Sequence, residues 1–540
     1  MMAKVKADAN APTSMKELKD TLWKAADKLR GSMDASQYKD IILGLVFLKY
    51  VSDAFEERRG QIFAELEAEG YEVSAIEEIA ADPDEYLGSG VFWVPEQARW
   101  TFLAQNAKGF TPAPGEAEQS IGELVDAAME MIMRRNPSLQ GTLPRIFNRD
   151  NVDQRRLREL VDLFNSSRFT GEGQTKARDL LGEVYEYFLE KFAKAEGKRG
   201  GEFYTPAGVV RVLVEMLEPD HGRVYDPACG SGGMFVQAEK FLASHNREGS
   251  EISVFGQELN ERTWRMAKMN LAIHGLHGNL GSRWGDTFAR DIHPDLQADF
   301  VMANPPFNIK DWVRNESDPR WRFGVPPKNN ANYAWLQHIV SKLAPGGSGG
   351  VVMANGSMSS NSGGEGEIRA QLVEADLVSC MVALPTQLFR STAIPVCVWF
   401  FAKDKSAGKG GSVDRRGQVL FLDARGMGHM VDRAERALSD EDIAKIASTF
   451  HSWRGKVDAD GVEPAPYEDV PGFAYSAPID EIKAADYALT PGRYVGAAAV
   501  EEDAEPLEAK LARLTDELET QFAESERLAA VVREQLRRVK

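Results

Sequence analysis

The sequence contains little cysteine and no long apolar run. Only three cysteines occur among 540 residues, Cys229, Cys380 and Cys397, which is too few for a disulfide framework and gives no metal-ligand spacing. No apolar run reaches the roughly 20 residues that a membrane-spanning helix requires. The N-terminus also lacks the apolar segment of a signal peptide. We therefore expect a cytoplasmic protein with no metal site and no membrane partner.

The chain also lacks an excess of positive charge. It carries 64 lysines and arginines against 82 aspartates and glutamates, which gives a formal net charge of −18. Non-specific affinity for nucleic acid depends on basic side chains that neutralise phosphates. A protein that coats nucleic acid by general attraction is thereby excluded. Any contact with DNA has to be local or supplied by another subunit.

No internal repeat is present, but three regions differ in their hydrophobic pattern. Residues 1–165 show apolar side chains at spacings of three and four, which predicts a helical N-terminal domain. Residues 166–480 contain short apolar strands separated by segments long enough for helices. Residues 481–540 end in an apolar stripe from Leu511 to Val539 at three- and four-residue spacing. The stripe predicts a coiled-coil-like helix that binds a partner chain or, alternatively, packs on its own domain.

The strands of the middle region predict an α/β fold. The segments "RVYDPA", "ISVFGQEL", "DFVMANP" and "GGVVMANG" alternate with helical segments, which is typical of a doubly wound, Rossmann-like, mostly parallel sheet. Two further strands, "LVSCMVALP" and "IPVCVWFFAK", follow each other after a short connection. We expect these two to form an antiparallel hairpin that closes one edge of the sheet, with "GQVLFLDARG" as one more strand.

A glycine-rich stretch, "DPACGSGGMF", runs from Asp226 to Phe235 between the first strand and a predicted helix. Glycines here allow a tight turn and a close approach of the backbone to a ligand at the helix N-terminus. The dinucleotide fingerprint Gly-x-Gly-x-x-Gly is not met, because Phe235 stands where the third glycine is needed, and no Walker lysine follows. The stretch indicates a nucleotide-like cofactor and disfavours hydride and phosphoryl transfer.

Two acids follow the next strands in order. Glu258 in "FGQELN" ends the second strand, where doubly wound proteins bind ribose hydroxyls. Asp286 in "WGDTF" lies at the expected end of the third strand, where its carboxylate can accept a hydrogen bond from an adenine amino group. Each acid alone is as well explained by a helix cap or a solvated loop, but the series after a glycine loop favours one shared pocket.

The fourth strand ends in Asn304, Pro305, Pro306 and Phe307. The two prolines end the strand and hold the groups beside them in place. The Asn304 carboxamide oxygen and the Pro305 carbonyl can both accept from a planar amino group, on which Phe307 can stack. Drawing the amine hydrogens out of the ring plane frees the nitrogen lone pair to attack a methyl sulfonium. The motif therefore suits methylation of an exocyclic amine.

In this order, "GGEFYTP", "DPACGSGG" and "NPPF" resemble the motifs of the modification subunits of type I restriction-modification systems. These subunits are S-adenosylmethionine-dependent methyltransferases that act on N6 of adenine in DNA. The N-terminal "LRGSMDASQYKDIILGLVFLKYVSDAFEERR" and the late "DYALTPGRYV" resemble the same family, so the similarity covers roughly residues 15–495.

The resemblance implies a role for each matching residue. Asn304 to Phe307 would hold an adenine flipped out of double-stranded DNA. Ala207 departs from the family, in which a basic residue often stands there, so no charged contact is expected from it. The residues implied to bind S-adenosylmethionine are Glu202, Phe203, Tyr204, Thr205, Pro206, Ala207, Asp226, Gly230, Ser231, Gly232, Gly233, Glu258 and Asp286.

Residues 311–333, directly after the catalytic motif, interleave aromatic and basic side chains, among them Trp312, Arg320 and Trp321. They form either a lid or DNA-facing loop, or an ordered loop whose tryptophans pack on the domain. The family resemblance implies DNA, a specificity subunit that chooses the target and a second copy of the chain as partners. It leaves open whether a restriction (nuclease or translocase) subunit joins. Two other functions also stay open: a self-sufficient DNA, RNA or protein-glutamine amino-methyltransferase, and a non-catalytic assembly scaffold.

Overall fold

The computed structural model divides the chain into two compact units, Met1–Val495 and Gly496–Lys540. It describes residues 19–20, 23–24, 27, 35–166, 177–196, 205–245, 252–389, 394–408, 411–433, 435–457, 461, 463–497 and 507–538. Within these ranges, none of the helices is both long and apolar enough to cross a membrane.

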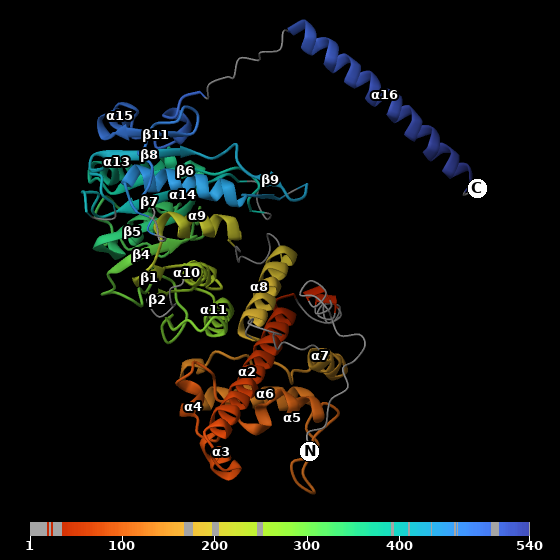
Figure 1. Ribbon diagram of the computed structural model, residues 1–540. Coiled ribbons are helices and arrows are strands. Elements are labelled where there is room, and N and C mark those ends of the chain that lie inside the picture. Colours follow the sequence, from red (N-terminus) through yellow and green to blue (C-terminus); the bar gives the residue numbers. More distant parts are fainter. Residues whose placement is uncertain are drawn as a thin grey trace. The chain divides into compact units, whose positions relative to one another are not determined.

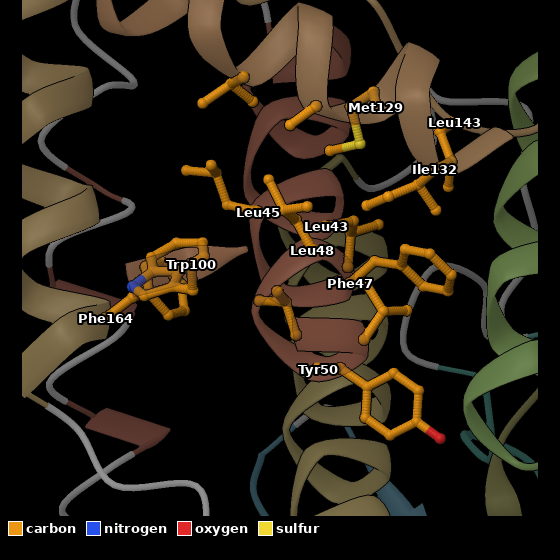
Figure 2. Close-up of a cluster of buried hydrophobic side chains, with 14 of the residues drawn as sticks. Leu43, Leu45, Phe47, Leu48, Tyr50, Trp100, Met129, Ile132, Leu143 and Phe164 are labelled. Atoms are coloured by element: carbon orange, nitrogen blue, oxygen red, sulfur yellow. The ribbon is translucent and has the colours of Figure 1, made fainter. Parts of the chain in front are cut away.

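The N-terminal part of the first unit is helical and is built around one long helix, α2 (Ala35–Ala68). Side chains of α2 such as Phe47 and Leu48 pack with Trp100, Ile132 and Phe164 from three other helices (Figure 2). The other helices of this part are α3 (Val73–Ile79), α4 (Asp84–Leu87), α5 (Trp100–Gln105), α6 (Ile121–Arg135), α7 (Gln154–Ser166) and α8 (Ala177–Glu196).

The start of α6 illustrates how the sequence sets these helices. The Ser120 side chain accepts a hydrogen bond from the Glu123 N–H, and the Glu123 carboxylate accepts one from the Ser120 N–H. This capping box satisfies two backbone donors that the first turn leaves open. Behind it, Leu124, Val125 and Ala128 are buried at helical spacing. The predicted helix is thus anchored at its first residue and buried along one face.

The second part is a nine-stranded mixed sheet with the order β11-β8-β6-β7-β5-β4-β1-β2-β3 (Figure 1). The strands are β1 (Gly222–Asp226), β2 (Ile252–Gly256), β3 (Gly278–Asn279), β4 (Ala298–Ala303), β5 (Leu343–Ala354), β6 (Val378–Ala383), β7 (Val396–Ala402), β8 (Gln418–Asp423) and β11 (Ala474–Pro478). A separate two-stranded ribbon joins β9 (His429–Met430) to β10 (Arg436–Ala437).

Helices cover both faces of the sheet, as the alternation of its strands requires. Neighbouring residues of a strand point to opposite faces, and Val224 and Tyr225 of β1 belong to two different cores. On the face of Val224 lie α9 (Ala207–Leu217), α10 (Gly233–Ser244), α11 (Glu261–Ile273) and α14 (Asp440–Arg454). On the face of Tyr225 lie α12 (Asn332–Lys342), α13 (Glu365–Glu374) and α15 (Ile479–Ala484). The doubly wound α/β fold is confirmed.

Two details of the sheet differ from the sequence-based prediction. The strands β6 and β7 are antiparallel neighbours as expected, but β8 pairs with the outer side of β6 and β11 with β8. Both sides of β6 are thus paired, and the hairpin lies inside the sheet and not at its edge. All six residues of β6 are accordingly buried. The third strand is also shorter than predicted: β3 ends at Asn279, so Asp286 lies in the loop that follows.

The chain changes direction across the sheet between β1 and β4. Following the chain, β2 and β3 lie on one side of β1, whereas β4 pairs with its other side, in parallel, through Val224↔Phe300 and Tyr225↔Val301. The loops at the carboxyl ends of β1 and β4 therefore leave a crevice between them, which is where doubly wound sheets bind ligands.

Beyond Gly496 and Ala497, the second unit is described from Leu507 to Arg538, which form one helix, α16. Its apolar side chains are largely exposed, with 46% of Leu514, 50% of Leu518 and 61% of Phe522 accessible. Exposed leucines at helical spacing are typical of a surface that another helix covers.

Candidate active site

A pocket of about 730 Å³ lies at the carboxyl ends of β1, β2 and β4. Its size is within the roughly 300–1,000 Å³ of ligand sites. Of the residues predicted from sequence, it is lined by Gly230, Ser231, Glu258, Asp286, Asn304 and Pro306. A narrower recess of about 70 Å³ continues from it and is lined by Thr205, Ala207, Asp226, Gly230, Ser231, Gly233 and Asn304. The structure thus brings together motifs that lie up to 99 residues apart.

The glycine loop after β1 turns sharply into α10. Gly230 and Gly232 have φ of 54° and 80°, values that side-chain-bearing residues rarely adopt. A Cβ built on Gly230 or Gly233 would meet no other atom within 4 Å, so both glycines face open space. The loop therefore brings bare backbone up to the pocket at the N-terminus of α10, as its sequence predicts.

Glu258 binds the glycine loop directly. Its Oε2 accepts a hydrogen bond of 3.1 Å from the Gly230 N–H, and its Oε1 accepts one of 2.8 Å from the Asn260 N–H. The Gly285 N–H donates to the Glu258 carbonyl oxygen across 2.8 Å, which places the loop of Asp286 beside it. Two of the predicted acids therefore meet at the pocket although β3 is short.

Asp286 uses only part of its carboxylate within the fold. Its Oδ1 accepts from the Phe288 N–H at 2.7 Å and from the Ala289 N–H at 3.3 Å. Its Oδ2 has no hydrogen bond to any residue that the structure describes. The carboxylate is half-buried and lines the pocket, so one oxygen holds the loop and the other is available to a ligand.

Asn304 is held by a residue from a different motif. Its Nδ2 donates a hydrogen bond of 2.8 Å to the Thr205 hydroxyl oxygen, which fixes the rotation of the carboxamide. Its Oδ1 is buried and finds no hydrogen-bond partner among the described residues. Because an unpaired buried acceptor costs free energy, this atom is a strong candidate for contact with a ligand.

Asp226 and Asn270 add two buried polar groups to the recess. Burial, together with the nearby Glu258, raises the pKa of Asp226 to about 8, although its Oδ1 accepts from the Ala228 N–H at 2.9 Å. Asn270 on α11 donates from Nδ2 to the Ser231 carbonyl oxygen at 2.9 Å. Its Oδ1 is buried and unpaired within the described ranges. No motif marks Asn270 in the sequence, and its only signal is a polar side chain on the apolar face of "MAKMNLAI".

Aromatic side chains form the wall of the pocket beside Asn304. Phe288, Trp312 and Trp335 line it, and the rings of Phe288 and Trp335 have centroids 4.3 Å apart. Phe307, the predicted stacking residue, is half-buried and packs against the cores on both faces of the sheet. Phe288 is the last residue of "WGDTF", where only Asp286 is predicted to contact a ligand, and Trp335 lies in a segment without a motif.

The loop 311–333 is ordered, and its tryptophans pack on the domain. Trp312 and Trp321 are 9% and 8% exposed and share a cluster with Phe288 and Trp335. The guanidinium of Arg320 donates to the carbonyl oxygens of Thr287 at 2.8 Å and Phe288 at 3.2 Å. The structure therefore shows the tryptophan packing that one of the two alternatives predicts.

The lining does not include three further predicted residues that the structure describes, Pro206, Gly232 and Pro305. Pro206 directly precedes the first turn of α9, and Gly232 directly precedes the first turn of α10. Pro305 is buried just after the end of β4. Glu202, Phe203 and Tyr204 lie outside the residues that the structure describes. Nowhere in the described ranges do three His, Cys, Asp or Glu side chains form a group that could hold a metal ion.

The charge around the pocket is mostly negative. Glu258, Glu261, Asp286 and Asp311 all line it. The basic residues of its lining are Lys39, which is 6% exposed, and Arg262, whose Nε lies 3.6 Å from the Asp40 carboxylate. A pocket of this kind favours hydrogen-bond donors and cations and does not attract phosphate groups.

Comparison with known proteins matches two family models. The model of the N-6 DNA methylase family matches residues 176–503, and that of the HsdM N-terminal domain matches residues 18–164. The "Type I restriction enzyme HindI methylase subunit" of Haemophilus influenzae is 46% identical over 82% of this chain and 99% of its own length. The "Type I restriction enzyme MjaIX methylase subunit" of Methanocaldococcus jannaschii is 38% identical over 96% of this chain and 90% of its own length.

A solved structure is similar along most of the chain. The methyltransferase subunit of a type I restriction-modification system from Streptococcus thermophilus superposes with a TM-score of 0.71 and 25% identity. The superposition covers 89% of this chain and 100% of that one. The helical part and the sheet therefore both have counterparts in a solved structure.

Proposed function

Because the chain belongs to the N-6 DNA methylase family, and within it to the methylase subunits of type I restriction enzymes, we propose that the glycine-loop pocket binds S-adenosylmethionine and that Asn304 binds the target adenine. The chain is an adenine-specific DNA methyltransferase. What is proposed is the role of each residue in that reaction. The unpaired Oδ1 of Asn304, at the carboxyl end of β4 beside the glycine loop, carries the proposal.

The pocket suits the cofactor because each part of the molecule has a matching group. Open space in front of Gly230 and Gly233 leaves room for the ligand to approach the backbone. Glu258 would accept from ribose hydroxyls, and the second oxygen of Asp286 from the adenine amino group. Asn270 Oδ1 and Asp226 are acceptors for an ammonium group in the recess. When bound, the cofactor supplies a methyl group on a positively charged sulfur.

The other predicted cofactor residues lie in the turn before α10 or in segment 202–207 before α9. Ser231 and Gly232 form the turn that leads into α10, and Thr205, Pro206 and Ala207 lead into α9, with Thr205 and Ala207 lining the recess. We propose that Glu202, Phe203 and Tyr204 complete this side of the site. Their assignment rests on the match of "GGEFYTP" to the family motif.

Asn304 would act on the amine as a hydrogen-bond acceptor that is held in one orientation. Since Nδ2 is hydrogen-bonded to Thr205, Oδ1 is the atom that would accept from the ligand. Together with the Pro305 carbonyl it accepts the two amine hydrogens and draws them out of the ring plane. The nitrogen lone pair is then free to form the new N–C bond, and the proton is lost as that bond forms. Pro306 keeps the acceptors in place, and Phe307 and the aromatic wall contact the flipped base.

We also propose that a separate specificity subunit chooses the DNA sequence. The net charge of −18 and the acidic pocket give this chain little general attraction for DNA. The exposed stripe of α16 offers that subunit, or a second copy of this chain, a helical surface. A restriction subunit would be a further partner of the complex, whose work on DNA takes place in the cytoplasm.

The residue roles can be tested by methyl transfer with and without the specificity subunit. Labelled S-adenosylmethionine and DNA are incubated with the chain, and the modified base is mapped. We expect N6-methyladenine at one sequence when both subunits are present, and a loss of about a hundredfold or more in rate for Asn304→Ala. Binding of a non-reactive cofactor analogue should survive in this variant. An unchanged rate would refute the role of Asn304, and full sequence-specific activity of this chain alone would refute the delegation of target choice.

A further inference from the structure

The catalytic loop, residues 304–309 after β4, is bound to the first turn of α12 and to Ala331 directly before it. The Asn308 N–H donates to Asn332 Oδ1 at 2.7 Å, and Asn332 Nδ2 donates back to Asn308 Oδ1 at 3.0 Å. On either side of this reciprocal pair, the Ala331 N–H donates to the Ile309 carbonyl oxygen and Trp335 Nε1 to the Pro306 carbonyl oxygen, at 3.0 and 3.1 Å. Four hydrogen bonds thus join residues 306–309 to residues 331–335.

The reciprocal pair supports a strained turn. Asn308 has a φ of 62°, in the left-handed region that side-chain-bearing residues seldom adopt. The chain bends at this residue, directly after Phe307. Asn332 is only 3% exposed, so water does not compete for its carboxamide. A buried amide that both donates to and accepts from one residue selects a single conformation of that residue.

The turn faces the pocket. Asn304, Pro306 and Ile309 of the catalytic loop line it, and so does Trp335 of α12. Only Pro305, Pro306 and Phe307 separate Asn308 from Asn304, and φ is fixed at both prolines, so this short segment has few ways to absorb a change at Asn308. A change in the conformation of Asn308 therefore moves the acceptors that contact the base.

We infer that Asn332 is a positioning residue of the methyl-transfer reaction: by holding Asn308 in the left-handed conformation, it keeps Asn304 and the Pro305 carbonyl aimed at the target adenine. This inference rests on the role proposed above for Asn304. Asn332 does not touch the base in this arrangement and acts only through Asn308.

The test uses the full chain in complex with the specificity subunit, on DNA whose methylated adenine has been mapped. Asn332→Ala should lower kcat between about tenfold and a hundredfold, since a small misplacement of reacting groups has costs of that order. The Kd of a non-reactive cofactor analogue should stay within about twofold, because the cofactor residues lie on other loops. Amide hydrogen exchange should rise in residues 307–309. The matched control is Asn329→Ala, an exposed asparagine of the neighbouring turn, which should leave kcat unchanged.

A second substitution separates positioning from simple loss of stability. Glycine adopts a φ near +60° without support, so Asn308→Gly in the Asn332→Ala background should recover most of the lost kcat. An unchanged kcat in Asn332→Ala would overturn the inference, and so would the absence of recovery in the double variant. If Asn304→Ala kept full activity, the proposed function itself would fail. A requirement for Asn304 with no requirement for Asn332 would refute this inference alone.

Discussion

The hydroxyl oxygen of Thr205 accepts a hydrogen bond of 2.8 Å from Asn304 Nδ2, across 99 residues of sequence. Thr205 belongs to the segment before α9 and Asn304 to the end of β4, so the bond joins two motifs of the site. It also leaves Oδ1 as the end of the carboxamide without a partner among the described residues, because Nδ2 is occupied. In the proposed reaction, Thr205 therefore orients the acceptor that Asn304 provides.

Thr205→Val should lower the rate of methyl transfer about tenfold, the effect expected when one hydrogen bond no longer fixes a reacting group. Valine has nearly the same shape but offers Asn304 Nδ2 no acceptor, so the carboxamide can rotate. Thr205→Ser keeps the hydroxyl and should stay close to wild type. Single-turnover rates with saturating cofactor measure the difference. Equal rates for the valine and serine variants would show that the bond does not orient Asn304.

The buried carboxyl of Asp226 should make stability depend on pH. Burial, with a contribution from Glu258, raises its pKa to about 8 in the folded protein, against roughly 3.9 for an unfolded aspartate. Between these values the folded state keeps a proton that the unfolded state has lost. The free energy of unfolding therefore falls as pH rises from about 4 to about 8 and then levels. Asp226→Asn removes this pH dependence, while the Oδ1 of the new asparagine can still accept from the Ala228 N–H.

The measurement compares urea unfolding of wild type and Asp226→Asn at several values of pH from 5 to 9. The stability of the variant relative to wild type should increase across this range up to about pH 8. Asp295→Asn, at an exposed loop position, is the control and should follow wild type. Parallel curves for wild type and Asp226→Asn would mean that Asp226 is ionised throughout.

How much of the site could be predicted depends on how local each signal is. Gly230, Glu258 and Asn304 each follow a buried strand, and the carboxyl ends of parallel strands meet at one edge, so their meeting could be predicted. Thr205 could be assigned to the cofactor by its motif, but its bond to Asn304 could not. Asn270 lies on a helix that carries no motif, and only tertiary packing aims it at the recess.

The same limit applies to the fold. Periodicity identifies β6 and β7 as strands but contains no information on which strand pairs with the outer side of β6, so the sequence predicts the hairpin but not its place inside the sheet. The loop 311–333 was ambiguous for a related reason. Aromatic side chains beside arginines suit both a DNA contact and a packed cluster, and the choice depends on Phe288 and Trp335, which come from other segments.

Arg320 should stabilise the fold because its planar guanidinium binds several partners at once. Besides the carbonyl oxygens of Thr287 and Phe288, its guanidinium binds the Asp318 carboxylate and donates to His338 Nδ1 at 3.0 Å. Burial, together with the charge of Arg320, holds the pKa of His338 well below its usual range, so its ring is neutral and can accept this bond. A lysine keeps the charge but cannot reach all four partners.

Arg320→Lys should therefore lower the free energy of unfolding by roughly 2–4 kcal/mol, because buried acceptors lose their donors. Urea unfolding followed by tryptophan fluorescence reports this directly, since Trp312 and Trp321 lie in the same loop. Acrylamide should quench these tryptophans more strongly in the variant. Arg322→Lys, at an exposed position two residues away, is the matched control. Equal stability of the two variants would show that the loop does not depend on Arg320.

The apolar stripe of α16 should be required for assembly with the specificity subunit. Leu514 and Leu518 are about half exposed and lie one turn apart on the same side of the helix. Leu514→Glu with Leu518→Glu places two charges where a partner helix would bury two leucines, so affinity should fall by roughly a hundredfold or more. The cofactor pocket is formed by residues before Val495, and binding of a cofactor analogue should be unchanged. Ala523→Glu puts the same charge on the opposite side of α16 and should leave the complex intact. A complex that tolerates the leucine substitutions as well as Ala523→Glu would assign the partner to another surface of this chain.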